Sequence, residues 1–180
     1  MTDQTPPRIS PPPAAHPAHF RQAMRVLASG IAVIATHDAE HRPIGMTATS
    51  LTSFSADPPS ILFCAARTGM LAGNLQPGQA VGINILAGDQ AEIANTFAGL
   101  TGLRGAHRFS TGSWIRGSLD VPILLGARCA IECSIDEIID RHTHRIVLCL
   151  VHRIHPGKLD DPGLVADSGR MTSFSPLTHS

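Results

Sequence analysis

Hydroxyl side chains are concentrated in one short stretch, GMTATSLTSFSADPP, which runs from Gly45 to Pro59. In an extended chain, Thr47 and Thr49 point to one face, and Ser50 and Thr52 point to the other. Hydroxyls and free backbone N–H groups suit a large ligand that carries a phosphate group and a polar ring edge. The stretch therefore predicts a ligand-binding segment. A Ser/Thr-rich hairpin loop is the alternative with the same composition.

The composition narrows the class of protein that presents this segment. The chain has 180 residues, of which 43% are hydrophobic and 16% charged, as expected of one globular domain. Its 14 basic residues balance its 14 acidic residues, so no net field attracts nucleic acid or an anionic membrane. The sequence contains neither a long apolar span nor a signal-peptide pattern. We therefore expect a cytoplasmic protein that binds no nucleic acid and no membrane.

The cysteines fit the same compartment. Cys64, Cys129, Cys133 and Cys149 form no CxxC pair, and each lies in an apolar run. A free cysteine in such a run behaves as a small hydrophobic residue. Cys129 and Cys133 share one face of a predicted strand, but a zinc site needs two more ligands nearby. We predict buried free thiols and no metal site.

The chain divides into a Pro-rich arm over 1–18, a domain over 19–172 and a polar tail over 173–180. The composition of the arm predicts a disordered or extended segment. Phe20, Met24 and Leu27 recur at helical spacing and predict a helix that starts at His19 and stops before Ser29-Gly30. Apolar runs predict strands over 31–36, 44–49, 60–66, 79–86, 127–138, 144–154 and 164–167.

Two of these strands carry further information. In the strand over 127–138, cysteine and isoleucine alternate with Ala130, Glu132, Ser134 and Asp136, which predicts one solvent-facing side. In the strand over 144–154, both faces are apolar from residue 146 to 151, which predicts cover on both sides. A domain of this size rarely covers both faces of an outer strand alone. A homodimer interface is therefore expected there.

Helices are few and short. A brief helix is predicted over 71–75, and a second over 90–97, where Asp89 is the expected N-cap and Glu92 its capping-box partner. Residues 100–122 are predicted to form an excursion over the surface. Many strands with few helices favour a β-barrel over alternating βαβ units. No GxGxxG or GxxxxGK[ST] motif is present, so a nucleotide must be held by other means.

The order of several motifs resembles the short-chain flavin reductases. The opening FRQAMRVLASGIAVIAT, the hydroxyl-rich stretch, VGINIL, DQ, FAG and the RF pair at 108–109 occur in the order typical of that family. The resemblance covers Phe20 to Arg170. It implies a mainly β fold, an FMN-binding split β-barrel with a few short helices that forms a homodimer. It also implies a flavin reductase that transfers a hydride from NADH or NADPH to FMN or FAD and supplies a partner monooxygenase.

The resemblance also implies which residues touch each nucleotide. One group would line the flavin ring, a second would lie near the ribityl chain or phosphate, a third would flank the ligand, and a fourth would close the site. The ring group is Thr47, Ala48, Thr49, Ser50 and Leu51, and the ribityl or phosphate group is Ser53 and Ser55. The flanking group is Phe63, Cys64, Ala65 and Ala66, followed by a helix that begins over Arg67 to Met70 and points at the phosphate. The closing group is Phe97, Ala98 and Gly99, with Arg104 or Arg108 as the phosphate counter-charge. The nicotinamide would be held by His144, Gly169 and Arg170.

The chain departs from the family pattern at one point. Where such proteins usually end in Gly-Arg/Lys-Tyr-His, this chain has Gly169-Arg170-Met171-Thr172. The altered ending favours, as an alternative, a flavin-binding electron carrier or storage protein without NAD(P)H oxidation. A relative of the pyridoxamine-phosphate oxidases would need more Arg and Lys around its phosphate, and a pure interaction module leaves the hydroxyl run unexplained. Hydride transfer needs no general base or nucleophile, so no residue is assigned a catalytic role.

Overall fold

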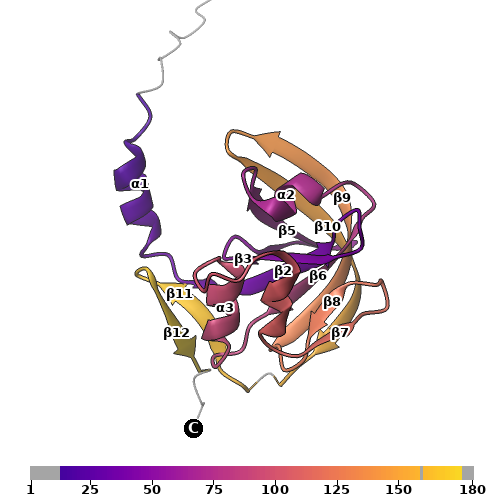
Figure 1. Ribbon diagram of the computed structural model, residues 1–180. Coiled ribbons are helices and arrows are strands. Elements are labelled where there is room, and N and C mark those ends of the chain that lie inside the picture. The colour runs from indigo at the N-terminus through magenta and orange to yellow at the C-terminus, as the bar shows by residue number, and fades with distance from the viewer. Residues whose placement is uncertain (1–12, 159, 176–180) are drawn as a thin grey trace, which may run out of the picture.

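A single antiparallel sheet of seven strands organises the computed structural model, which describes residues 13–158 and 160–175. The strand order is β3-β2-β6-β9-β10-β5-β4, and the sheet curls so that the long β9–β10 hairpin runs along one side (Figure 1). Their bounds are β2 (Ala32–His37), β3 (Pro43–Ala48), β4 (Thr52–Ala56), β5 (Pro59–Ala66), β6 (Ala80–Ile85), β9 (Cys129–Arg141) and β10 (His144–Pro156). The expected mainly β split barrel is confirmed.

Strand β2 is apolar on both faces because it packs into two cores. Ala32 and Ile34 belong to the core inside the barrel, where Ile34 pairs with Ile83 of β6. Val33 and Ala35 belong to a second core, which lies under the helix that spans residues 91–97. Both cores exclude water from the strand. A continuous apolar run is therefore stable here, without the alternation of apolar and polar residues that a half-exposed strand shows.

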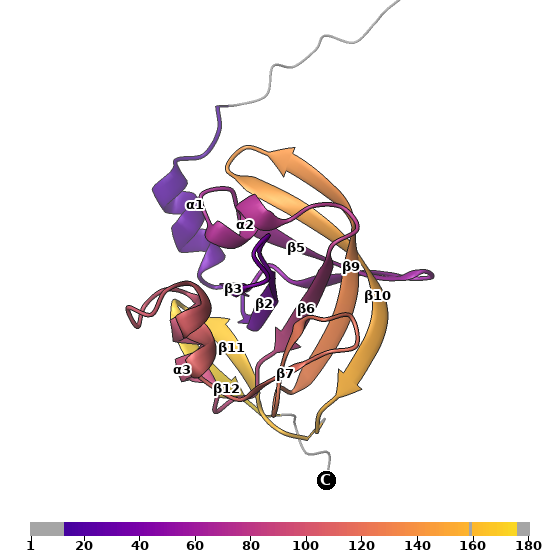
Figure 2. The same ribbon diagram turned by 45° about the vertical axis from the view of Figure 1, so that its right-hand side comes forward.

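The described part of the chain contains four short helical segments. They are α1 (Pro17–Met24), α2 (Met70–Asn74), α3 (Ala91–Phe97) and the 3-10 helix η1 (Gly105–Ser110). Helix α2 lies over one end of the barrel and α3 lies against its side, near β11 (Figure 2). Helix α1 begins two residues before the predicted start and stands apart from the barrel.

The predicted capping box of α3 is wrong, although the helix itself is present. Gln90, rather than Asp89, occupies the N-cap position, and no side chain caps the helix there. The Gln90 side chain instead accepts from the Ala87 amide at 2.9 Å and donates to the Gly126 carbonyl at 3.0 Å. Long-range contacts of Gln90 therefore fix the start of α3, which a local pattern does not reveal.

Two smaller sheets complete the fold. The first contains β1 (Ser29–Gly30), β11 (Gly163–Asp167) and β12 (Arg170–Phe174), and the second contains β7 (Trp114–Arg116) and β8 (Pro122–Leu124). Strands β1, β4, β7, β8 and β12 were not predicted, and β12 extends two residues into the expected tail. The predicted surface excursion over 100–122 is wrong at Val121 and Pro122, which are buried where β8 begins. Residues 1–12 of the expected arm and 176–180 of the tail lie outside the described residues.

The predicted solvent-facing side of β9 is wrong at Glu132, whose side chain is fully buried. The loop between β7 and β8 covers it. The carboxylate accepts from the Leu119 amide at 2.6 Å and lies 2.7 Å from Nε2 of His155 on β10. Gly117 passes so close that a Cβ there would lie 2.8 Å from the Glu132 carboxyl carbon. Period-2 alternation does not reveal a loop that folds back from earlier in the chain.

Two of the four cysteines are buried thiols as predicted, Cys133 and Cys149, while Cys64 and Cys129 are half-buried. Burial raises the pKa of the Cys133 thiol to about 12. No group of three or more His, Cys, Asp or Glu side chains that could hold a metal ion occurs among the described residues. Within the same residues, no helix is both long and apolar enough to cross a membrane.

The buried carboxylate leads to a prediction about stability. Burial alone raises the pKa of Glu132, but hydrogen bonds from the Leu119 and Ser118 amides and from His155 outweigh it and hold the pKa below its ordinary value of 4.5. Its stabilising effect is therefore present at neutral pH and is lost as the pH falls below 4.5 through the folded-state pKa. Glu132→Gln should lower the free energy of unfolding at pH 7 by about 1–3 kcal/mol, measured by urea denaturation.

The exposed Glu137 on the same strand is the matched control, and Glu137→Gln should change stability by less than about 0.5 kcal/mol. The difference between Glu132→Gln and the wild type should shrink in acid. A difference that stays constant from pH 7 to pH 3 would contradict a stabilising charged form.

Candidate functional site

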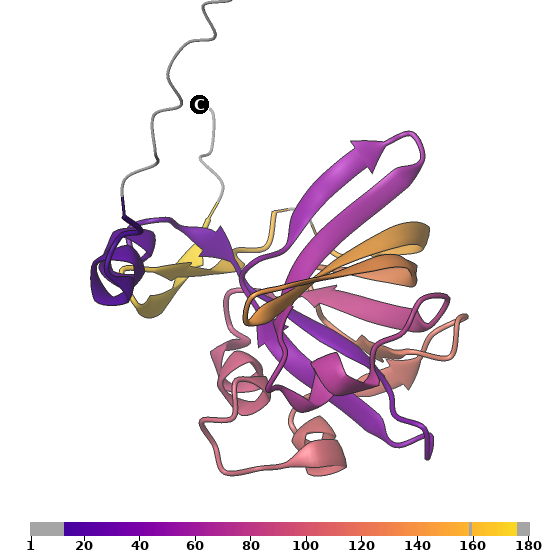
Figure 3. The ribbon, with the colours of Figure 1, turned by 90° about the horizontal axis from the view of Figure 1, so that it is seen from above.

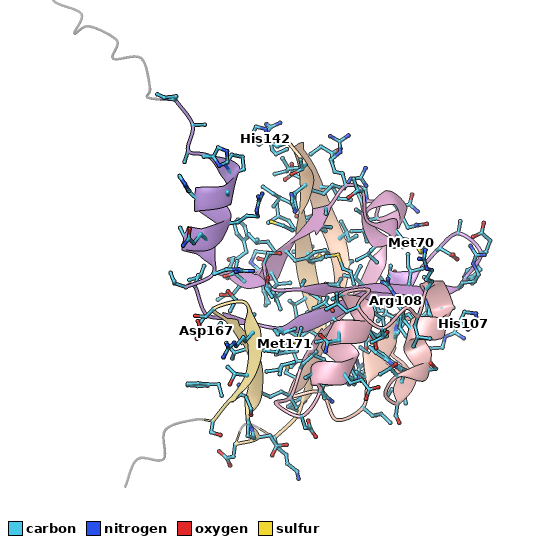
Figure 4. The ribbon with its side chains drawn as sticks, turned by 60° about the vertical axis from the view of Figure 1, so that its left-hand side comes forward. Met70, His107, Arg108, His142, Asp167 and Met171 are labelled. Carbon is cyan, nitrogen blue, oxygen red and sulfur yellow. The ribbon has the colours of Figure 1, made fainter. Side chains whose placement is uncertain are left out.

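A cavity of about 450 Å³ opens between β3, α2, the end of α3 and η1. Met70 of α2 and Arg108 of η1 lie on the same side of the molecule, facing this space (Figure 4). The cavity is lined by residues 44–47, 66, 69–71, 97–99, 102–105 and 108. It brings together eight of the predicted flavin residues: Thr47, Ala66, Met70, Phe97, Ala98, Gly99, Arg104 and Arg108.

Backbone carbonyls hold Arg108 in place within this cavity. Its Nη1 donates to the Gly45 carbonyl at 3.4 Å and to the Phe97 carbonyl at 3.3 Å, while Nε donates to the Leu103 carbonyl at 3.2 Å. Its Nη2 donates no hydrogen bond to any of residues 13–158 and 160–175. Arg104 lines the same cavity and is exposed. The cavity therefore has a cationic wall with donor capacity left for an anionic ligand.

The hydroxyl-rich segment connects this cavity to a second one. Strand β3 ends at Ala48, which is buried, and the chain then bends at Thr49. Thr49 and Ser50 line a separate cavity of about 360 Å³. The rest of its wall comes from the end of α1 and the segment after it, and from β11 and the β11–β12 turn. The residues are Met24, Arg25, Leu27 and Ser29, and Ala166, Asp167 and Gly169. Residues 47–50 thus form a partition between the two cavities.

Several of the hydroxyls hold the backbone rather than pointing to open space. Thr47 donates to the Ala94 carbonyl of α3 at 2.6 Å. The Ser50 hydroxyl accepts from the Cys64 amide at 3.0 Å and donates to the Cys64 carbonyl at 3.2 Å. Ser55 bonds to the backbone of Asp57 within the β4–β5 turn. These bonds fix the segment against α3 and β5.

Other predicted residues lie outside both cavities. Phe63 and Ala65 are fully buried in the barrel core, because the odd-numbered residues of β5 from 61 to 65 point into the barrel. Leu51 packs against that core, and Cys64 meets the segment only through its backbone. Ser53 lies exposed on β4. Of the predicted residues at the end of β5, Ala66 alone lines the first cavity.

The predicted nicotinamide residues come from two regions. His144 is exposed at the start of β10, opposite Ala66 of β5, and its Nδ1 lies 2.9 Å from the Thr143 hydroxyl. Gly169 lines the second cavity, and Arg170 begins β12 opposite Asp167. In Figure 4, His142 in the β9–β10 turn lies far from Asp167 and Met171 of the β11–β12 sheet. The structure therefore does not place His144 beside Gly169 and Arg170 within one chain.

Sequence reasoning did not predict several residues that line these cavities. Among them are two charged side chains of the second cavity and the glycine-rich loop of the first cavity. Arg25 and Asp167 line the second cavity from opposite ends of the chain, and no local pattern connects them. The loop of the first cavity carries Gly99, Gly102 and Gly105, all with positive φ. The regular spacing of these glycines is a signal that could have identified a tight loop around a ligand.

Comparison with known proteins identifies the family of this domain. Residues 24–175 match the model of the flavin reductase like domain. The chain belongs to this family.

Three curated relatives are similar over most of this chain. A probable flavin reductase of Rhizobium meliloti is 33% identical over 73% of this chain, which spans 41% of that protein's length. The 4-hydroxyphenylacetate 3-monooxygenase reductase component of Salmonella dublin is 33% identical, with 76% of this chain and 79% of the relative covered. The FMN reductase (NADH) RutF of Pseudomonas syringae is 30% identical, with 83% of each covered.

Solved structures show the same fold. A crystal structure of a putative flavin reductase from Haemophilus somnus matches with a TM-score of 0.82 and 27% identity, over 88% of this chain and 99% of that chain. The NADH:FAD oxidoreductase SgcE6 of Streptomyces globisporus, in complex with NAD and FAD fragments, matches with a TM-score of 0.80 and 25% identity, over 90% of this chain and 94% of that chain.

Proposed function

We propose that this protein is an NAD(P)H-dependent flavin reductase that passes a hydride from a nicotinamide to FMN or FAD. The observation that carries the proposal is the 450 Å³ cavity, in which three backbone carbonyls fix Arg108 beside the hydroxyl-rich segment. Membership of the flavin reductase like family supports it. A fixed guanidinium with a free donor edge suits a phosphate-bearing substrate.

Different residues would bind different parts of the flavin. Arg108 and Arg104 would receive the phosphate, and the closing segment Phe97, Ala98 and Gly99 would line its path. The flavin ring would lie along residues 47–50, which separate the two cavities. Thr49 and Ser50 would contact the ring edge that faces the second cavity. Bound flavin supplies the two-electron acceptor, so the protein itself needs only to bind and orient.

The nicotinamide would approach from the side of the second cavity. Gly169 and Arg170 lie there on the β11–β12 turn, while His144 lies at the start of β10. Relatives named as NADH-using reductases support NADH, and NADPH is the alternative to be tested.

We propose a homodimer because the single chain leaves unusual apolar surface exposed. Phe20, Met24 and Leu27 at α1 are 60%, 43% and 58% exposed. On β10, Ile146, Leu148 and Leu150 are half-buried rather than covered. Figure 3 shows α1 and the β11–β12 sheet beside the barrel, with the β4–β5 hairpin projecting from it. Apolar surface of this kind marks an interface with another chain.

The destination of reduced flavin is proposed from the relatives. A relative named as the reductase component of a monooxygenase supports a flavin-dependent monooxygenase as the partner. Such a reductase must release its product, so its flavin cavity should stay open at one edge. The free cysteines fit a reducing compartment, and we place this activity in the cytoplasm.

The first prediction from the proposed function concerns turnover. Purified protein should oxidise NADH or NADPH in air only when FMN or FAD is added, because the flavin is a diffusible substrate. Absorbance of the reduced nicotinamide measures this directly for each of the four pairs. Tight flavin binding without nicotinamide oxidation would contradict the reductase and favour the electron carrier that the Met171-Thr172 ending indicates.

The second prediction concerns the phosphate. Arg108→Gln should weaken FMN binding about tenfold or more, because a charge-assisted hydrogen bond is lost, while riboflavin, which has no phosphate, should bind nearly as before. Fluorescence titration of both flavins measures the ratio. Arg141→Gln, at the exposed end of β9, is the matched control. Equal weakening of FMN and riboflavin would assign Arg108 only to holding the Gly45 and Phe97 carbonyls.

The third prediction concerns assembly. Sedimentation equilibrium of the wild type should give twice the chain mass. Phe20→Ser combined with Met24→Ser should shift the equilibrium toward monomer, whereas Gln22→Ser on the opposite side of α1 should not. A monomeric wild type at micromolar concentration would exclude the dimer. A dimer that the double variant leaves intact would place the interface away from α1.

A further inference from the structure

A third cavity, of about 360 Å³, lies between the β2–β3 turn and the β7–β8 hairpin. It shares no lining residue with the two cavities of the proposed flavin site. Much of its lining is apolar and includes the aromatic rings of Phe109 and Trp114, together with Ile115 and Val121. A concave site of this size with aromatic walls suits a single ring.

Four polar side chains complete the lining. His37 and His41 come from the end of β2 and the following turn, while Arg116 and Asp120 come from the β7–β8 hairpin. Arg116 forms an ion pair with Asp120. The pKa of the Asp120 carboxyl is lowered, first by this arginine and more weakly by the two histidines, so each of these three groups lies within electrostatic reach of Asp120. Three groups that can carry positive charge thus surround one carboxylate, which already has a partner.

The wall formed by the β7–β8 hairpin is held rigidly from beneath. Asn84 is fully buried, donates to the Pro122 carbonyl at 3.3 Å, and accepts from the Leu124 amide at 2.8 Å. Glu132 is fully buried as well and binds the Leu119 amide. Gly82 lies so close to this hairpin that a Cβ there would lie 2.6 Å from the Pro122 carbonyl oxygen.

Burying the polar side chains of Asn84 and Glu132 costs more free energy than a hairpin that only connects two strands would require. A buried amide and a buried carboxylate both lose hydration, and apolar residues could fill the same space at lower cost. What they add is fixed backbone geometry at residues 116–124. A preorganised wall of this kind reduces the ordering cost of binding a ligand.

We propose that this cavity is a second ligand site, distinct from the flavin site, that binds a small aromatic carboxylic acid. The ring lies against Phe109 and Trp114, and the carboxylate faces Arg116 and the imidazoles of His37 and His41. Arg116 can bind the incoming carboxylate while it retains Asp120, because a guanidinium offers five donors.

The chain supplies its own reporter for this site. Trp114 is the only tryptophan, and the sequence contains no tyrosine, so intrinsic fluorescence arises from a residue that lines this cavity. Titration of the flavin-free full-length protein with benzoate should change this fluorescence saturably, with a Kd of about 1 mM or lower. Benzyl alcohol, which has the same ring without the charge, should bind about tenfold more weakly.

Two variants test the site directly. Arg116→Gln should weaken benzoate about tenfold, whereas Arg153→Gln, an exposed arginine on β10, should leave it unchanged. If Arg116→Gln disturbs the hairpin, Ile115→Glu provides an independent test, because residue 115 is 45% exposed and the new carboxylate should repel benzoate. Equal binding of benzoate and benzyl alcohol, or full affinity in both variants, would overturn the proposal.

Competition separates this site from the flavin site. Equilibrium dialysis of radiolabelled benzoate should give the same affinity with and without excess FMN. Displacement of benzoate by FMN would place it in the flavin cavity and overturn the proposal, whatever the outcome of the NAD(P)H assay.

Discussion

Strand β2 has to bury both of its faces, and this constraint determines how the helices and the smaller sheets pack around the barrel. One face joins β6 and β5 in the barrel core, and the other requires α3, β8 and β11 to pack over it. Helix α3 is therefore held against β3, where Thr47 bonds to the Ala94 carbonyl. Gly45 lets the two approach, because a Cβ there would lie 2.8 Å from the Phe97 ring. The first cavity lies at the edge of this contact.

The hydroxyl-rich segment works mainly by fixing backbone. Thr47 and Ser50 bond to main-chain groups of α3 and β5, so the hydroxyls that suggested a ligand also anchor the partition between two cavities. In the proposed site, Arg108 is likewise held by carbonyls of three different segments. A rigid backbone of this kind suits a reaction in which two ring systems must be stacked at a set distance.

The parts of the fold that depend on local pattern were predictable. The apolar runs of β2, β6 and β10 and the helix that ends at Phe97 were found from periodicity and composition. Glu132 was misassigned because the loop that covers it comes from earlier in the chain, and β4 was missed because its residues are polar and exposed. Arg25 and Asp167 meet only after folding, so no spacing rule connects them to Thr49. The Asp89 cap failed because a long-range bond of Gln90 sets the helix start.

Phe97 lies at the junction of two regions that have been described separately. It lines the first cavity, while its ring centroid lies 4.9 Å from that of Phe109 and 5.3 Å from that of Trp114, which both line the third. A change of size at this one position would alter the shape of both cavities at once. During divergence, the two cavities therefore cannot be adjusted independently through this ring, and substitutions here must be compatible with both ligands.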